Sequence, residues 1–468
     1  MSVSQLLKAH FNEYLAALAV SSALFMVILC MSWSSPALPK LLAEDSPIPI
    51  TADDGSWIVA MISIGLTLGP FVTAKAADGI GRKRTLLCAA IPVTTGWLLM
   101  AFGNSVGYLY LARFLFGLSS GMVFSVKPLY LGESCSQNIR GSAVVLCDVC
   151  SKLAVIVMYG IGPHVEFRTL AWIGMIGPIV FVLSFMWMPE SPHFLLSKGK
   201  FKEAESSLAW LRRSSNVTKE LEAMKEFVQR SKHESGSFWR MFAPAYRKNI
   251  RIVWILLFGM SFTGVFMIMA YAQTIFIQIS SDIKPSAMSL IFGIIQTLSS
   301  ALAALTIDRV GRRPLLLFST GGTTLGLLVI CVYFTISTEN DAPFLGWMAF
   351  IAMLLVVVSF GMGLLVIPPI YDAEVLPIPI RAYTNATSTS IFGLAYFMNM
   401  KLFQILTDNV GAYVPFAGYT VAGLITGVLI YIYVPETKGR SLEEIEHMIA
   451  KGQVKAVKRA SDVELFNG

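Results

Sequence analysis

The chain has 468 residues, of which 55% are hydrophobic and 14% are charged, and its mean hydropathy is +0.65. This composition excludes an ordinary soluble domain, because too few polar side chains remain to cover a water-exposed surface. The formal net charge is +7, but the basic residues follow a membrane topology, so the positive balance does not require a nucleic-acid partner.

Twelve apolar stretches are each long enough, at about 17–25 residues, to cross a bilayer as a helix. The first is longer than the apolar part of a secretion signal and eleven more follow it, so we interpret it as an uncleaved span. We therefore predict an all-α integral membrane protein. The expected spans are 14–36, 55–75, 85–102, 106–128, 141–163, 169–188, 250–278, 286–306, 313–335, 345–370, 384–405 and 413–434.

Lysine and arginine are unequally divided between the two sides of this topology. With the N-terminus inside, most of the 36 basic residues fall in inner segments, and the outer loops hold only Lys40, Arg168 and Lys284. Because cytoplasmic loops are enriched in basic residues, we expect cytosolic termini and a multi-pass protein of the plasma membrane. The expected parts are a six-helix bundle over 1–188, a cytosolic linker with short amphipathic helices over 189–249, a second six-helix bundle over 250–434 and a cytosolic tail over 435–468.

Three charged signatures occur twice, in the same order, about half a chain length apart, and each lies at the end of an apolar stretch. A duplicated half-bundle of this kind is a common construction of transporters. The signatures are Asp78-x-x-Gly81-Arg82, Glu133 with Arg140, and Glu190 in the first half, and Asp308-x-x-Gly311-Arg312, Glu374 with Arg381, and Glu436 in the second.

We expect these carboxylates and guanidiniums to form ion pairs at one end of the two half-bundles. Charged groups at membrane depth are costly unless paired, and an arginine–carboxylate pair is directional. Such pairs can hold the inner end shut and part when the halves rock, which makes them candidate gating residues. The alternative is that the basic residues only set the topology, but this does not account for matched acidic residues at fixed offsets.

The signatures resemble those of the sugar porter family of the major facilitator superfamily, and the resemblance covers essentially the whole chain. It implies two pseudo-symmetric six-helix bundles, alternating access, and a hexose or disaccharide site between the halves. The resemblance also rests on segments 113–121, 128–133, 189–192 and 435–439, and segments 33–39, 55–58 and 271–276 are similar to insect facilitated trehalose transporters.

The expected sugar site departs from the family pattern. The resemblance implies Gln in helix 5, where this chain has Asp148, and Asn-Trp in helix 11, where it has Phe392-Gly393; the helix 7 amides are also absent. Each sugar hydroxyl that loses water needs a new partner, so the fold does not fix the solute. The candidate solute-binding residues are Asp148, Lys152, Ser261, Thr263, Tyr271 and Gln296.

Asp148 and Lys152 lie four residues apart, and therefore on one face of helix 5. A single charge near the middle of a membrane helix costs about 2.5–3.5 kcal/mol. Three interpretations are open: a self-neutralised pair, a site that binds solute hydroxyls, or a proton-coupling site at which Asp148 titrates. In helix 11, Lys401 is expected to reach the outer interface or to pack on an aromatic ring.

The sequence predicts a solute carrier and not an enzyme, because it contains no phosphate-binding loop, metal-ligand cluster or nucleophile–base pair. We expect no cofactor. The leading function is facilitated transport of a sugar or sugar-like polyol. The alternatives are a proton-coupled or differently selective carrier built on Asp148 and Lys152, and a non-transporting membrane sensor. The expected partners are a small-molecule solute and the lipid bilayer, with protons as a further candidate and no nucleic acid.

Overall fold

The structure is a computed structural model, and it describes residues 10–214, 216–233, 238–279, 282–336, 343–438, 440, 444–445 and 448–449. The regular elements in these ranges are helices. Eleven helical segments of this part of the chain are long and apolar enough to cross a membrane. The expected span 384–405 lies in α20 (Ile378–Asn409), which is not among the eleven because Ser, Thr and Lys401 lower its mean hydropathy.

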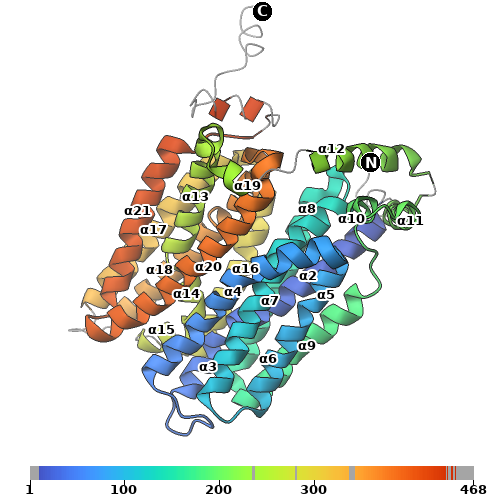
Figure 1. Cartoon of the computed structure of the whole chain (residues 1–468). Helices are drawn as coiled ribbons and strands as arrows, with labels where there is room; N and C mark the ends of the chain where they lie inside the picture. Colours follow the sequence, from blue (N-terminus) through green and yellow to red (C-terminus); the bar gives the residue numbers. More distant parts are fainter. Residues whose placement is uncertain are drawn as a thin grey trace, which may run out of the picture.

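The first half of the chain forms one bundle, coloured blue to green in Figure 1. The start of α4 shows how local sequence sets a helix end: Thr51 Oγ1 accepts from the N–H of Asp54, and the Asp54 carboxylate accepts from the N–H of Thr51. This reciprocal cap satisfies two backbone donors. The elements are α2 (Phe11–Ser32), α3 (Ser34–Leu41), α4 (Ala52–Ile80), α5 (Arg82–Cys88), α6 (Ala90–Phe102), α7 (Val106–Ser134), α8 (Gln137–Ile161), η1 (Gly162–His164) and α9 (Phe167–Phe185).

The second half forms the other bundle, coloured yellow to red in Figure 1. Its first span is broken at Gly264, where the φ angle is +70°, so the chain passes from α13 to α14 in the middle of the bundle. The elements are α13 (Arg247–Phe262), α14 (Val265–Ala270), α15 (Ala272–Gln278), α16 (Pro285–Val310), α17 (Arg312–Ile336), α18 (Pro343–Met362), α19 (Pro368–Val375), α20 and α21 (Tyr413–Tyr433).

The segment that connects the two bundles in the sequence forms short helices at one end of the molecule (Figure 1). This is the end at which α2 begins and α21 ends. We call this the linker end, and the opposite one the far end. Ala204, Leu208 and Leu211 lie on one face of α11 and are buried. The linker elements are α10 (Pro192–Ser197), α11 (Phe201–Arg212), α12 (Thr218–His233), η2 (Phe238–Phe242) and η3 (Pro244–Tyr246).

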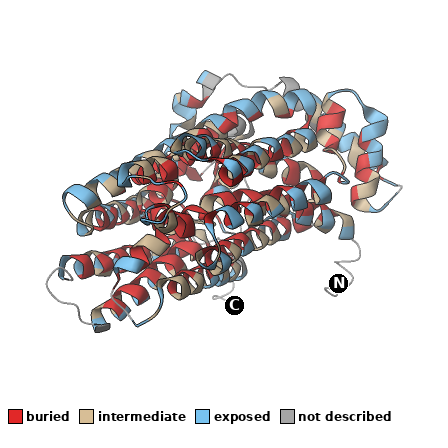
Figure 2. Ribbon diagram, turned by 90° about the horizontal axis from the view of Figure 1, so that it is seen from below, coloured by how far each residue is buried: buried red, intermediate tan, exposed pale blue. Residues whose placement is uncertain are grey.

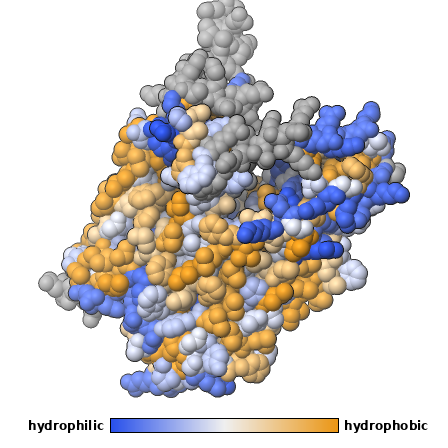
Figure 3. Space-filling view, in the orientation of Figure 1, coloured by the Kyte–Doolittle hydropathy of each residue, from blue (hydrophilic) through white to orange (hydrophobic). Residues whose placement is uncertain are grey.

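Apolar side chains cover both the inside and much of the outside of the bundle. In Figure 2, the buried residues lie on the sides of the helices that face other helices. Figure 3 shows hydrophobic side chains over the middle of the outer surface. Leu305, Ile91 and Phe71 are 71%, 66% and 64% exposed. An apolar surface of this extent is disfavoured in water but suits the hydrocarbon of a bilayer.

The two halves meet along two helix pairs, α4 with α20 and α8 with α16. The first helix of each pair belongs to the first half and the second helix to the second half. Residues on the facing sides of these four helices are therefore placed to respond when the halves move against each other.

Candidate functional site

In the first half, Arg82 joins three helix ends at the linker end. Its Nε lies 3.0 Å from Glu133 Oε2, and its Nη1 lies 3.5 Å from Asp78 Oδ1. The backbone N–H groups of Arg82 and Lys83 donate to Glu190 Oε1 at 3.0 and 2.9 Å. Glu190 therefore closes the N-terminus of α5, where free N–H groups favour an anion.

The second half repeats this arrangement with its own residues. Arg312 Nη2 lies 3.4 Å from Glu374 Oε1. The backbone N–H groups of Arg312 and Arg313 each donate to the Glu436 carboxylate at 3.0 Å. The duplicated sequence signature thus corresponds to a duplicated network of the same chemistry.

A glycine precedes each of these arginines and gives the turn its shape. The φ angles of Gly81 and Gly311 are +105° and +106°, which lie in the left-handed region that glycine enters without a steric penalty. A Cβ at Gly81 would lie 2.2 Å from Glu190 Oε2, and one at Gly311 would lie 2.8 Å from Glu436 Oε2. Both turns therefore require glycine for conformation and for space.

Each of these networks lies within one half of the molecule, so the described contacts stabilise each half at the linker end and do not join the halves. The predicted gating role of these residues stays a prediction. Arg140 is exposed and donates to the backbone oxygen of Cys135 at 3.4 Å; within the described chain it does not pair with Glu133. The side chains of Asp308 and Arg381 lie outside the described residues.

Lys401 on α20 joins the two halves at the far end. Its Nζ donates to Asp53 Oδ1 at 3.0 Å and to Ser56 Oγ at 2.7 Å, both on α4. The ammonium also lies 4.2 Å from the centroid of the Trp57 ring, so the expectation that Lys401 packs on an aromatic ring is confirmed. The ion pair and the cation–π contact together hold α20 against α4.

Further contacts between the halves lie toward the same end. The hydroxyl of Tyr159 on α8 donates to the backbone oxygen of Met269 on α14 at 2.6 Å. The backbone N–H of Gln273 on α15 donates to Ser35 Oγ on α3 at 3.0 Å. Together with Lys401, these contacts join the two halves toward the far end.

Asp148 and Lys152 form the predicted pair, with Nζ 3.9 Å from Oδ1. Val155 and Tyr159 continue the same face of α8, and a Cβ added to Gly293 on α16 would lie 3.2 and 3.3 Å from them. This face is therefore directed at the opposite half. The Lys152 side chain is 8% exposed and that of Asp148 is 40% exposed, so the carboxylate is the accessible member of the pair.

Three of the other predicted binding residues are buried and keep a polar atom that has no hydrogen-bond partner among the described residues. These atoms are Ser261 Oγ, the Tyr271 hydroxyl and Gln296 Oε1. A buried polar atom without a partner costs about 1–3 kcal/mol, and a bound hydroxyl group removes that cost. Thr263 differs, because its hydroxyl already donates to the backbone oxygen of Gly259 at 2.9 Å.

Gln296 also reaches the boundary between the halves. Its Nε2 lies 3.3 Å from the sulfur of Met269, the residue whose backbone oxygen accepts from Tyr159. Gln296 on α16, Met269 on α14 and Tyr159 on α8 are thus in one chain of contacts, which brings the candidate residues of the second half next to the face that carries Asp148 and Lys152.

Sequence reasoning missed Asn399 on α20. Its side chain is 4% exposed, and its Nδ2 donates to the backbone oxygens of Ala395 at 2.8 Å and Ser261 at 3.3 Å. Asn399 lies seven residues after Phe392 and on the same helix face, so the amide is two turns away from the position at which the family pattern places it. A polar amide inside an apolar span was the available signal.

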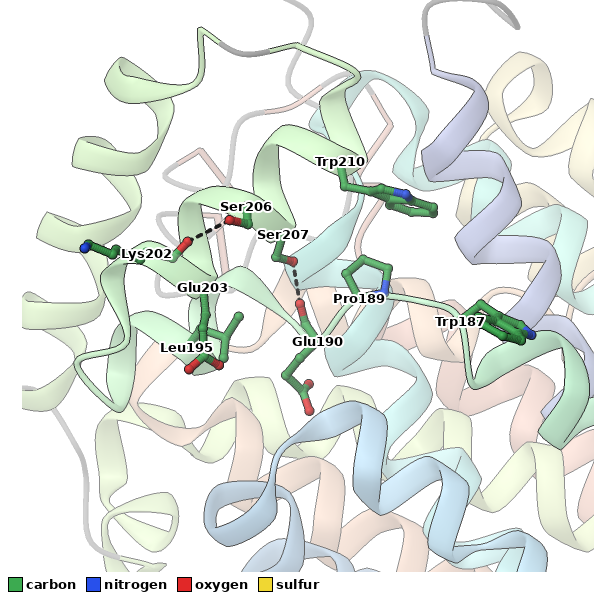
Figure 4. Close-up of a pocket in the computed structure, with 9 residues that line it drawn as sticks. All are labelled: Trp187, Pro189, Glu190, Leu195, Lys202, Glu203, Ser206, Ser207 and Trp210. Atoms are coloured by element: carbon green, nitrogen blue, oxygen red, sulfur yellow. Dashed lines mark hydrogen bonds between the residues drawn. The ribbon is translucent and has the colours of Figure 1, made fainter.

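A hollow at the linker end adjoins the first charged network but not the predicted solute site. It has a volume of about 510 Å³ and lies between the end of α9 and the linker helices α10 and α11. In Figure 4, Trp187 and Trp210 flank it, and Ser207 Oγ donates to the backbone oxygen of Glu190 at 2.6 Å. This contact connects α11 to the backbone of Glu190, whose carboxylate accepts from the N-terminus of α5.

Sequence comparison shows that the chain is similar to known sugar transporters. The sequence model described as "Sugar (and other) transporter" matches residues 16–449. The chain is similar to the facilitated trehalose transporter Tret1 of Apis mellifera ligustica, at 30% identity over 442 residues, covering 94% of this chain and 88% of the relative. It is also similar to Tret1 of Bombyx mori, at 29% identity over 448 residues, covering 94% and 88%.

Solved structures have the same fold. A proton:xylose symporter XylE bound to 6-bromo-6-deoxy-D-glucose matches with a TM-score of 0.75 at 20% identity, covering 94% of this chain and 99% of that one. An inward open conformation of XylE from E. coli also matches with a TM-score of 0.75, at 20% identity and with 92% and 98% covered. The predicted all-α major facilitator fold is confirmed, and so is the expectation of a transporter and not an enzyme. The chain belongs to the sugar transporter family.

Proposed function

We propose that the protein carries a sugar across the plasma membrane by facilitated, alternating access, with its linker end and both termini in the cytosol. The observation that supports a sugar most directly is a set of three atoms with no hydrogen-bond partner in the described part of the chain: Ser261 Oγ, the Tyr271 hydroxyl and Gln296 Oε1. They can accept from or donate to the hydroxyls of a polyol that has lost its water. The names of the relatives favour a disaccharide of the trehalose type.

The contacts between the halves support the transport mechanism. Lys401 with Asp53 and Tyr159 with Met269 hold the far end together, while the described contacts of each charged network at the linker end lie within one half. This distribution supports a state in which the far side is closed and solute enters from the linker side. Rocking about the middle of the boundary then gives access from the other side.

Uptake by purified protein tests the proposal. Radiolabelled trehalose and glucose are offered to proteoliposomes, with and without an imposed pH gradient, and empty liposomes serve as the blank. Saturable uptake of either sugar that is indifferent to the gradient is the expected result. Absence of uptake of both sugars by folded protein would overturn the choice of a sugar as the solute.

Proton coupling is the second candidate, and it rests on Asp148. Its carboxylate is 40% exposed at the boundary between the halves, and its contact with Lys152 is 3.9 Å long, so a proton can reach it. If coupling operates, uptake by the wild type rises with an inward proton gradient and Asp148→Asn loses that rise. If Asp148 only neutralises Lys152, the same substitution leaves the response to the gradient unchanged.

A further inference from the structure

An apolar groove opens at the linker end of the second half, between α13 and α21. It has a volume of about 500 Å³ and is lined by Trp254, Ile255 and Phe258 of α13 and Leu429 of α21. These two helices pack against each other (Figure 1). On α21, Leu424 and Val428 are 59% and 57% exposed, so the groove belongs to the surface that faces the lipid.

Two arginines lie at the mouth of this groove. Arg247 and Arg251 line it together with the apolar residues, and their spacing of four residues places them on one face of α13, continuous with Trp254 and Phe258. Both are exposed, and neither forms an ion pair with a carboxylate of the described chain. Arg251 instead lies 4.2 Å above the centroid of the Tyr433 ring, which fixes its position at the entrance.

The sequence around the two arginines is basic and contains no acidic residue. From Phe238 to Arg251 the chain carries Arg240, Arg247, Lys248 and Arg251, and no Asp or Glu occurs between Glu234 and Asp282. The corresponding start of the first half is different, because α2 there carries Glu13, which is buried and paired with Arg212 at 3.2 Å. The two arginines are therefore a property of one half and not of the duplicated fold.

The groove and its mouth match a molecule with two chemical parts. From Arg251 to Phe258 the helix rises by about 10 Å, at 1.5 Å per residue, so an anion held by the arginines can continue into hydrocarbon beside Trp254 and Phe258. Exposed aromatic residues nearby, Trp239 at 76% and Phe242 at 45%, are typical of the level at which lipid headgroups meet acyl chains. A free soluble anion would leave the apolar part empty.

We propose that this groove binds one anionic phospholipid, with its phosphate between Arg247 and Arg251 and an acyl chain along Trp254 and Phe258. In the orientation proposed above for the transporter, the lipid belongs to the cytosolic leaflet, which is rich in anionic lipids. The bound lipid would stabilise the start of α13, the helix that contains Ser261 and leads through Gly264 to Tyr271.

Lipid binding to the purified full-length protein tests this. The number and affinity of bound lipids are measured by native mass spectrometry with phosphatidylserine or phosphatidylcholine added. Arg247→Gln/Arg251→Gln is compared with Lys219→Gln/Lys225→Gln, which removes the same charge from exposed residues of α12. We expect the arginine variant to bind phosphatidylserine at least tenfold more weakly, and the lysine variant to bind it like the wild type.

A second measurement locates the lipid. Phosphatidylserine with brominated acyl chains should quench tryptophan fluorescence in the wild type, and the loss of signal should shrink in Trp254→Phe. Three results would each overturn the proposal. They are binding of phosphatidylcholine as tight as that of phosphatidylserine, binding of phosphatidylserine by the arginine variant as tight as by the wild type, and binding of inorganic phosphate alone as tight as that of phosphatidylserine. If the double variant does not fold, Arg247→Gln alone carries the comparison. None of these readouts depends on sugar uptake, so the transport proposal can fail separately.

Discussion

Lys401 and Asp53 are 348 residues apart in the sequence, yet Lys401 Nζ lies 3.0 Å from Asp53 Oδ1 across the boundary between the halves. The two members differ in setting: the Lys401 side chain is 14% exposed and that of Asp53 is 74% exposed. The ammonium also contacts Ser56 and the Trp57 ring. The lysine therefore makes contacts with α4 beyond its ion pair with Asp53.

Lys401→Met should lower the melting temperature in detergent more than Asp53→Asn. The carboxylate is exposed, so its share is expected to be under 1 kcal/mol, whereas removal of the lysine also loses the cation–π contact of about 0.5–2 kcal/mol. The double variant should melt like Lys401→Met alone, because Asp53 acts through the lysine. If the melting temperature of the double variant falls by the sum of the falls in the two single variants, the two residues are not coupled.

Gly81→Ala should destabilise the protein, whereas Gly79→Ala should not. The methyl group of an alanine at position 81 would meet the Glu190 carboxylate, and the alanine backbone would have to adopt a φ angle of +105°. We therefore expect the free energy of unfolding to fall by about 1–3 kcal/mol. Gly79, two residues earlier, is in a helix and a Cβ there meets nothing within 4 Å. That substitution should raise stability by about 0.5–1 kcal/mol. Thermal unfolding of both variants decides, and similar shifts for the two would contradict the account of the turn.

Gln296→Leu should separate binding from stability. The side chain is 2% exposed and its Oε1 has no hydrogen-bond partner within the described ranges, so an apolar replacement of similar size is expected to leave the melting temperature unchanged or raise it. Uptake should fall about tenfold or more through a higher KM, because the solute loses a hydrogen bond in a dry site. A fall in both melting temperature and uptake would point to a structural role for Gln296. Thr263→Val is the comparison variant, because the Thr263 hydroxyl already has a hydrogen-bond partner in the protein.

His193→Gln should reduce the sensitivity of the fold to acid. Burial lowers the pKa of His193 below its ordinary value, against the opposing effect of the nearby Glu133 carboxylate. The unfolded chain then takes up a proton before the folded one, so this contribution to stability is present above about pH 6.5 and is lost as the pH falls below that value. Melting temperatures at pH 7.5 and 5.5 should differ less in His193→Gln than in the wild type. The exposed His164→Gln should behave like the wild type, and an unchanged slope in His193→Gln would exclude the effect.

The features that could be predicted are those that short stretches of sequence encode. The turns at Gly81 and Gly311 follow from a local motif, and the pairing of Asp148 with Lys152 follows from helical spacing. The partner of Lys401 could not be predicted, because nothing in the sequence near Asp53 marks it as a site of contact with α20. Asn399 was missed for a related reason: its partner is the backbone oxygen of Ser261, 138 residues away in the sequence.

Gly393 on α20 allows the backbones of the two halves to touch. A Cβ there would lie 2.9 Å from the backbone nitrogen and 3.0 Å from the Cα of Thr67 on α4, and Ser390 Oγ donates to the backbone oxygen of Thr67 at 3.2 Å. Thr67 divides α4 into arms of about 22 Å toward the far end and about 20 Å toward the linker end, at 1.5 Å per residue. In the proposed rocking of the halves, this central contact would act as the pivot: with arms of nearly equal length, each ångström by which one mouth narrowed would widen the other by about the same amount.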